Sequence, residues 1–365
     1  MGPITVHEST GDDLLPEWMQ TLEAPALEAS PLEVPPPEAP TLEALVLQKT
    51  PGSSARWKGL GVAVSIVIAV VAIFVLAHAL RHVDYQEVFA AIRSTKTGVV
   101  VLAFALVVSS YGSLTLYDLL ALRTIGLIDI PYRIAALASF VSYPIAHGTG
   151  AVAVVSPIIR YRIYSLRGLG VVDVAKICFL TGLTFWLGNL TALGLSLLYE
   201  PSAISLIDYI MPAVNRMLAA AILLGIVAFL VWSWRAPRSI GTQRWSVRIP
   251  SGPVVLLQIA IGIFDLGAAA LAMYVLIPPD LHIEFSRVVV VFIAATLLGF
   301  ASHAPAGLGV FDATIVLGLA GEDKEPILAA LLIFRFLYHF LPFLAASCLF
   351  GIVEATRGFR AKASL

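Results

Sequence analysis

Two short stretches of the chain combine histidine, proline and glycine, and both interrupt long apolar runs. The first reads PIAHGTGA (Pro144–Ala151) and the second reads SHAPAGLGVFD (Ser302–Asp312). Proline removes a backbone donor and glycine tolerates left-handed backbone, so such stretches break helices. Broken backbone at membrane depth is tolerated only beside protein or a water-filled cavity. We therefore expect each stretch to line a cavity. The expected turn residues are Pro144, Gly148, Gly150, Pro305, Gly307 and Gly309.

His147 and His303 lie inside these two stretches and are candidate substrate-binding residues. An imidazole can donate a hydrogen bond to a polar headgroup or relay a proton. The alternative role is capping of the backbone where each helix breaks. Both readings place the histidines at the expected turns.

Arg335 and Asp265 lie within apolar runs that are long enough to span a membrane. An arginine at the bilayer centre costs about 3 kcal/mol or more, so its presence needs a reason. Arg335 could clamp a lipid phosphate, because guanidinium pairs with phosphate through two hydrogen bonds. It could instead pair with Asp312 or with carbonyl groups freed at a break. Asp265 could pair with Arg335 or sense protons. Alternatively, it could simply lie near a cavity mouth. Asp312 is a further candidate substrate-binding residue.

Arg160 and Arg162 follow the first interrupted stretch. They could draw anionic headgroups to the cytoplasmic mouth of a cavity. The alternative is that they only anchor the chain on the cytoplasmic side, as basic residues do in most membrane proteins.

The composition indicates a polytopic helical membrane protein. Of the 365 residues, 59% are hydrophobic and only 13% are charged, whereas a soluble domain carries about 25% charged residues. The two cysteines give no disulfide framework, and each fits the role of a small apolar packing residue.

Residues 1–55 are expected to form a disordered, acidic, proline-rich cytoplasmic tail, and residues 56–365 a transmembrane domain. Residues 1–48 contain nine acidic residues and no lysine or arginine. The prolines forbid a continuous helix. An acidic tail argues against nucleic-acid binding, and it could dock a partner protein.

The fold class that we predict is all-α, with about six full spans plus two re-entrant broken-helix segments arranged as an inverted repeat. The expected spans cover about residues 60–80, 99–120, 172–198, 217–232, 254–276 and 327–353, and the interrupted stretches cover 134–159 and 288–319. If both interrupted stretches enter and leave on one side, 16 lysines and arginines lie inside and 6 outside. This arrangement satisfies the positive-inside rule, and eight crossings would violate it. Paired interrupted segments of opposite orientation indicate a substrate site between the repeats.

Three sequence stretches carry a resemblance to a known family. They are Pro157–Tyr164 (PIIRYRIY) followed by Gly168–Gly170, Pro305–Asp312 (PAGLGVFD), and Phe334–Tyr338 (FRFLY) followed by Leu341–Pro342. Together they resemble the transmembrane region of the lysylphosphatidylglycerol synthase family. This region is the lipid-flippase half of the bacterial multiple peptide resistance factor, and the family includes stand-alone integral-membrane relatives.

The resemblance covers about residues 58–355, and it implies a lipid translocator in the bacterial cytoplasmic membrane. Ala306 stands where the family has glycine, and Asp312 stands where it has glutamate. The family's synthase half is a soluble acyltransferase-like domain. It has no counterpart in these 365 residues, so we expect no lysyl transfer.

Three functions remain open from the sequence. The first is a flippase that moves a phospholipid or related polar lipid between leaflets; the others are an intramembrane enzyme of headgroup modification and a regulatory membrane subunit. The chain has no HExxH, GxSxG or P-loop motif and no metal-ligand cluster, so we expect no metal and no cofactor. We expect membrane lipids as partners, with a homodimer as an open option, and both termini in the cytoplasm.

Overall fold

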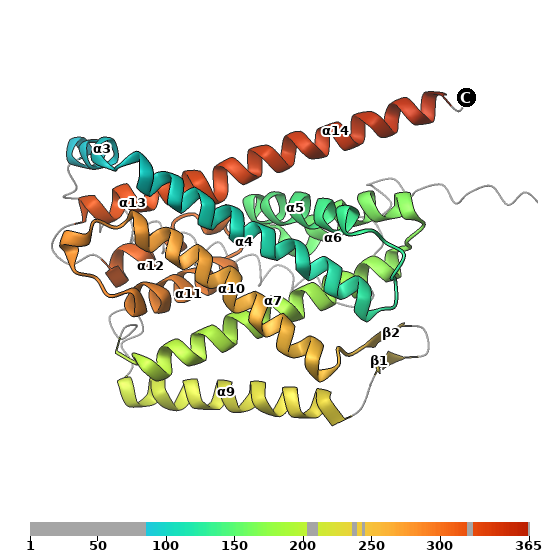
Figure 1. Cartoon of the computed structure of the whole chain (residues 1–365), viewed down its shortest axis with the longest axis horizontal. Coiled ribbons are helices and arrows are strands. Elements are labelled where there is room, and N and C mark those ends of the chain that lie inside the picture. Colours follow the sequence, from blue (N-terminus) through green and yellow to red (C-terminus); the bar gives the residue numbers. More distant parts are fainter. Residues whose placement is uncertain (1–84, 203–210, 236–238, 243–244, 320–323, 364–365) are drawn as a thin grey trace, which may run out of the picture. The chain divides into compact units, whose positions relative to one another are not determined.

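The computed structural model describes residues 85–202, 211–235, 239–242, 245–319 and 324–363. The predicted tail (1–55) and the first predicted span (60–80) lie outside these residues. The described part is helical apart from one small antiparallel hairpin, β1 (Ser239–Thr242) and β2 (Trp245–Arg248). The predicted all-α class is therefore confirmed (Figure 1).

Five helices in the described residues are long and apolar enough to cross a membrane. They are α4 (Thr97–Thr124), α7 (Val171–Tyr199), α9 (Pro212–Arg235), α10 (Gly252–Leu276) and the continuous last span Glu325–Ala355. They match five of the predicted spans, with ends that differ by up to five residues. The match follows from long apolar runs, which the sequence shows directly.

The last span consists of three consecutive pieces. These are α13 (Glu325–Arg335), a π-helical turn η5 (Phe336–Phe340) and α14 (Leu341–Ala363). π-Helical turns are rare and occur mostly where a helix must present side chains at a functional site. This turn adjoins Arg335.

The first interrupted stretch forms two helices, α5 (Tyr132–Thr149) and α6 (Val152–Tyr164), which pack against each other. Gly150 ends α5 in a left-handed conformation, with φ at 72°. The chain breaks here as predicted, but the break is shorter than expected. Pro144 and Gly148 were expected in the turn, and both lie inside α5, because the helix continues through Pro144 to Thr149. At 18 residues, α5 is about 27 Å long.

The second interrupted stretch forms α11 (Phe285–Ala301), a short 3-10 turn η4 (Pro305–Gly307) and α12 (Val310–Leu319). Its break is longer and more irregular than the first. Left-handed backbone occurs at His303, Ala306, Gly307 and Gly309. Helices α11 and α12 pack on one another, so this segment also turns back on itself. Both segments are helical hairpins, and their re-entrance into a membrane stays a prediction.

The main apolar core lies between α4, α10, α11 and α13. Fully buried residues include Ala270, Met273, Ile293 and Phe334. Gly188 of α7 and Gly262 of α10 let these two helices approach so closely that an added Cβ on either would overlap the other backbone. Small residues serve this purpose at helix crossings inside membranes.

The remaining elements lie outside this core. Helix α3 (Tyr85–Ser94) packs beside α13, and α9 packs beside α7 and α10 (Figure 1). Two further short 3-10 turns, η2 (Ser165–Arg167) and η3 (Pro279–Leu281), join longer helices. Only Asn215, Ala219 and Ser233 of α9 are buried, which fits a helix whose other faces contact lipid.

Candidate functional site

The two helix breaks lie in direct contact with each other. An added Cβ on Gly150 would collide with the carbonyl oxygen of His303 and lie 3.0 Å from the carbonyl carbon of Ala304. Gly150 also has a left-handed backbone, which residues with a side chain rarely adopt. The position therefore requires glycine for two separate reasons. The predicted turn residues Gly150 and Pro305 thus come together in space, although the chain separates them by more than 150 residues.

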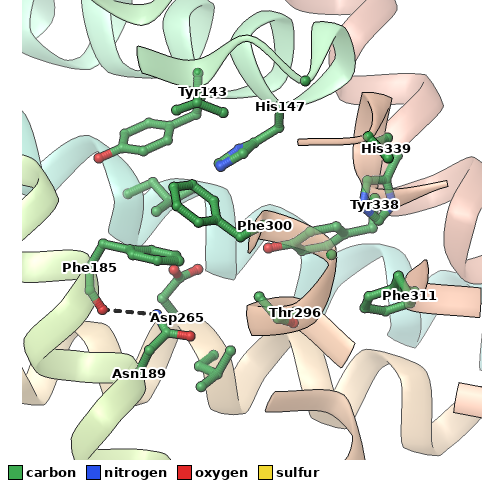
Figure 2. A pocket seen from close by; sticks show the side chains of 18 of the residues that line it. Tyr143, His147, Phe185, Asn189, Asp265, Thr296, Phe300, Phe311, Tyr338 and His339 are labelled. Atoms are coloured by element: carbon green, nitrogen blue, oxygen red, sulfur yellow. Dashed lines mark hydrogen bonds between the residues drawn. The ribbon is translucent and has the colours of Figure 1, made fainter. Parts of the chain in front are cut away.

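A cavity of about 120 Å³, which we call the central chamber, lies beside this contact. Its walls come from α4, α5, α7, α10, α11, the second break and the π-helical turn (Figure 2). The polar and aromatic residues that line it are Tyr111, Tyr143, His147, Phe185, Asn189, Asp265, Phe292, Thr296, Phe300, His303, Phe311, Tyr338 and His339.

Asp265 is the acidic residue of the chamber, and its side chain is held by hydroxyl groups. The Ser110 hydroxyl donates to Oδ1 at 2.5 Å, and the Tyr117 hydroxyl lies 3.5 Å from Oδ2. Among the described residues, no lysine, arginine or histidine forms an ion pair with this carboxylate. The sequence-based option that Asp265 pairs with Arg335 is therefore wrong, because Arg335 has another partner.

Three histidines line the chamber. His147 stacks against Tyr143 with 6.0 Å between ring centres, and His303 lies 3.0 Å from the carbonyl of Ala301 through Nδ1. His339 was not among the predicted site residues, yet it lines the chamber too. Its Nδ1 is buried and has no hydrogen-bond partner within the described part of the chain.

Asn189 is a chamber residue that was not among the predicted site residues. Its side-chain amide donates to the carbonyl of Phe185 at 2.9 Å, as Figure 2 shows. Its Oδ1 is buried without a hydrogen-bond partner among the described residues. An unpaired buried polar atom costs about 1–3 kcal/mol, so a ligand or water that donates a hydrogen bond here would be stabilised. A lone amide in the apolar run 172–198 was the signal that could have identified it.

Arg335 and Asp312 form a partly buried ion pair that fastens the second break. Arg335 Nε donates to Asp312 Oδ1 at 2.7 Å, and Nη1 donates to the carbonyl of Ala306 at 2.6 Å. The other carboxylate oxygen of Asp312 accepts the backbone N–H of Gly309 at 2.9 Å. Of the two roles predicted for Arg335, the structure contains the contacts of the second one, an ion pair plus freed carbonyls. The guanidinium also lines a neighbouring cavity of about 300 Å³, which we call the side cavity.

Arg160 is completely buried, and this corrects the expected position at a cytoplasmic mouth. It pairs with Asp118 of α4 at 2.7 Å and donates to Ser156, and its guanidinium lies 4.9 Å from the ring centre of Tyr143. Tyr164 donates a further hydrogen bond to Asp118 at 2.8 Å. The sequence analysis missed Asp118. As the single acidic residue in the run 99–120, it gave a signal that could have been noticed.

Arg162 lies apart from both cavities. It is about one-third exposed, and Glu354 of α14 lies 3.9 Å away. Of the predicted site and turn residues, the central chamber is lined by His147, Gly150, Asp265, His303 and Gly307, and the side cavity by Pro144, His147, Gly148 and Arg335. Arg160, Arg162 and Asp312 line neither.

The described residues include no group of three or more histidines, cysteines, aspartates or glutamates that could hold a metal ion. The chemical groups that the chamber offers are a carboxylate, imidazoles, an amide and hydroxyls. These groups can bind a polar group through hydrogen bonds or exchange protons with it.

Comparison with known proteins places the chain among bacterial membrane proteins. The inner membrane protein YbhN of Escherichia coli is 29% identical over 321 residues, covering 85% of this chain and 98% of YbhN. An uncharacterized protein of Synechocystis is 28% identical over 298 residues, covering 80% of this chain and 91% of that protein. The phosphatidylglycerol lysyltransferase of Staphylococcus haemolyticus is 28% identical over 294 residues, which are 76% of this chain and 32% of the enzyme. No family model matches the chain.

The first prediction concerns the buried Arg160–Asp118 pair. Asp118→Ala leaves the guanidinium without its charge partner, so the folded state should lose about 3–5 kcal/mol. Thermal unfolding in detergent measures the loss. Arg162→Met is the matched control, because exposed ion pairs contribute only about 0–1 kcal/mol. Equal melting temperatures for the two variants would show that the buried pair does not support the fold.

The second prediction concerns Arg335. Arg335→Met leaves Asp312 without its counter-charge and the Ala306 carbonyl without its donor, so stability should fall by up to about 3–5 kcal/mol. Adding Asp312→Asn should restore part of the loss, since the amide oxygen can still accept the Gly309 N–H. If Arg335→Met keeps the wild-type melting temperature but stops lipid movement, Arg335 acts on the lipid instead of the fold.

Proposed function

We propose that the chain belongs with the lysylphosphatidylglycerol synthase transmembrane-region family and is a lipid translocator, because it is similar to YbhN and to the phosphatidylglycerol lysyltransferases. It moves a phospholipid or related polar lipid between the two leaflets of a membrane. The headgroup occupies the central chamber, and the acyl chains stay in apolar surroundings. YbhN is an inner membrane protein, and we propose the same membrane for this chain, with both termini cytoplasmic.

One observation carries this proposal: a chamber that contains several polar side chains lies inside a protein with many exposed apolar side chains. Large hydrophobic side chains such as Leu224, Val227 and Phe264 are more than half exposed. Asp265, His147 and Asn189 instead face inward. A polar headgroup crossing the hydrocarbon layer loses its water, and a chamber of hydrogen-bonding groups replaces that hydration. Cavities between paired broken helices are where membrane transporters hold their substrates.

The charges around the chamber refine the mechanism predicted from the sequence. Arg160 and Arg335 each have a carboxylate partner, and neither lines the central chamber. Within the described residues, the chamber's lining contains no lysine or arginine. We therefore assign recognition of the headgroup to hydrogen bonds that Asn189 Oδ1 and the Asp265 carboxylate accept and that the histidines exchange with it. Arg335 can meet a lipid phosphate only from the side cavity.

A second candidate function is headgroup chemistry at the same place. His147, His303, His339 and Asp265 line one chamber, and imidazole and carboxylate groups are the usual acids and bases of enzymes. Analysis of lipid products after incubation separates the two candidates, because a translocator leaves the lipid unchanged.

The third prediction tests lipid movement directly. Vesicles that contain only this protein should expose inner-leaflet phosphatidylglycerol, labelled with a fluorophore on one acyl chain, to a membrane-impermeant quencher. Asp265→Asn should slow this exposure about tenfold or more, because a hydrogen bond to a charged group contributes about 1.5–3 kcal/mol. Asp280→Asn, an exposed position between α10 and α11, is the control and should behave as wild type. Protein-containing vesicles with the same quenching as empty ones would contradict the proposed function.

A further inference from the structure

The side cavity adjoins the central chamber, and its lining has a smaller polar share. Tyr111, His147, Ala306 and His339 line both cavities, so the two lie next to each other and share these residues. The other walls of the side cavity are mostly apolar. They include Leu308 and the phenylalanines Phe336, Phe340 and Phe343.

The π-helical turn sets this division between polar and apolar walls. Tyr338 and His339 line the central chamber, whereas Phe336 and Phe340 line the side cavity. These two rings stack at 5.6 Å and are 53% and 56% exposed, so the side cavity reaches the apolar outer surface. The Tyr111 hydroxyl donates to the backbone carbonyl of Tyr338 at 2.9 Å, which ties the turn to α4.

Phe343 of α14 lines the side cavity and packs against α5. Its ring fills the space where a Cβ of Gly148 would lie, and Gly148 therefore lets the two helices approach closely. A phenylalanine ring can change rotamer within nanoseconds when it is not fully buried. Phe343 is half-buried, so its ring can move at the edge of the cavity.

We propose that the side cavity is the seat of an acyl chain and that a lipid enters sideways between α5 and α14. This inference rests on the proposed function and names the route that the lipid takes. A headgroup in the central chamber must have its glycerol and acyl chains close to that chamber, and the side cavity adjoins it. The phenylalanine walls offer no partner for a polar group, and the exposed side of these walls faces lipid. Arg335 lines the side cavity, on the path from the central chamber to the apolar surface.

The test uses a substitution that should fill the side cavity without changing a residue of the central chamber. Leu308 is 55% exposed and has extended backbone, so tryptophan can be placed there without disturbing a helix. Leu308→Trp should slow movement of phosphatidylglycerol about tenfold. Leu344→Trp is the matched control, because Leu344 is 49% exposed on α14 but lines neither cavity.

A second measurement reports chain binding without relying on transport. Phosphatidylglycerol with a photoreactive diazirine on one acyl chain should label Phe343 in the wild type, and Leu308→Trp should lose this label. The wild type and Leu308→Trp should both keep the label at Leu224 of α9, which is 69% exposed on a helix that we expect to contact lipid.

The outcomes separate this inference from the proposed function. Normal lipid movement in Leu308→Trp would overturn the acyl-chain seat, and so would a wild type without label on Phe343. If Leu308→Trp does not fold, the presence or absence of the label on Phe343 in the wild-type protein decides whether an acyl chain binds in the side cavity. If the wild-type protein is labelled at Phe343 but moves no lipid, the acyl-chain site in the side cavity is supported and the proposed translocator function is contradicted.

Discussion

The contact between the two broken helices is the constraint on which the rest of the structure depends. Gly150 lies against the backbone of His303 and Ala304, so the first break fits only if the second keeps its shape. Backbone groups away from water need partners, and the second break obtains them locally. Ser302 accepts the N–H of Ala304, Asp312 accepts that of Gly309, and Arg335 donates to the carbonyl of Ala306. The central chamber exists because these contacts keep both breaks in place.

The buried charges divide into two kinds. Arg160 with Asp118 and Arg335 with Asp312 are paired, and each pair connects two separate segments of chain. Paired buried charges fix positions, since neither partner can leave without stranding the other. Asp265 has only hydroxyl partners and faces the chamber. The paired charges therefore shape the site, and the carboxylate without a counter-charge is free to act on a ligand.

The sequence predicted the parts of the fold that depend on local pattern. Apolar runs predicted five of the spans that the structure describes, and clusters of proline and glycine predicted both helix breaks. Contacts between distant segments could not be read in this way. Asp118 lies 42 residues from Arg160, and nothing in either local sequence specifies that pair. The π-helical turn was not foreseen, because FLYHF has no composition typical of such a turn. Pro144 was assigned to a turn because proline usually ends a helix. It remains inside α5, and the left-handed Gly150 ends that helix.

The central claim, that the two breaks must touch to form a lipid-handling chamber, is tested most directly by lipid movement in Gly150→Ala. Gly126 is the matched control, because its φ is also left-handed but no atom lies within 4 Å of an added Cβ. Alanine at either position strains the backbone, and only at Gly150 does it push the breaks apart. Our account predicts that purified, folded Gly150→Ala moves phosphatidylglycerol across vesicle membranes no faster than protein-free vesicles do. It also predicts that Gly126→Ala retains most of the wild-type rate. Equal rates in the two variants would contradict it.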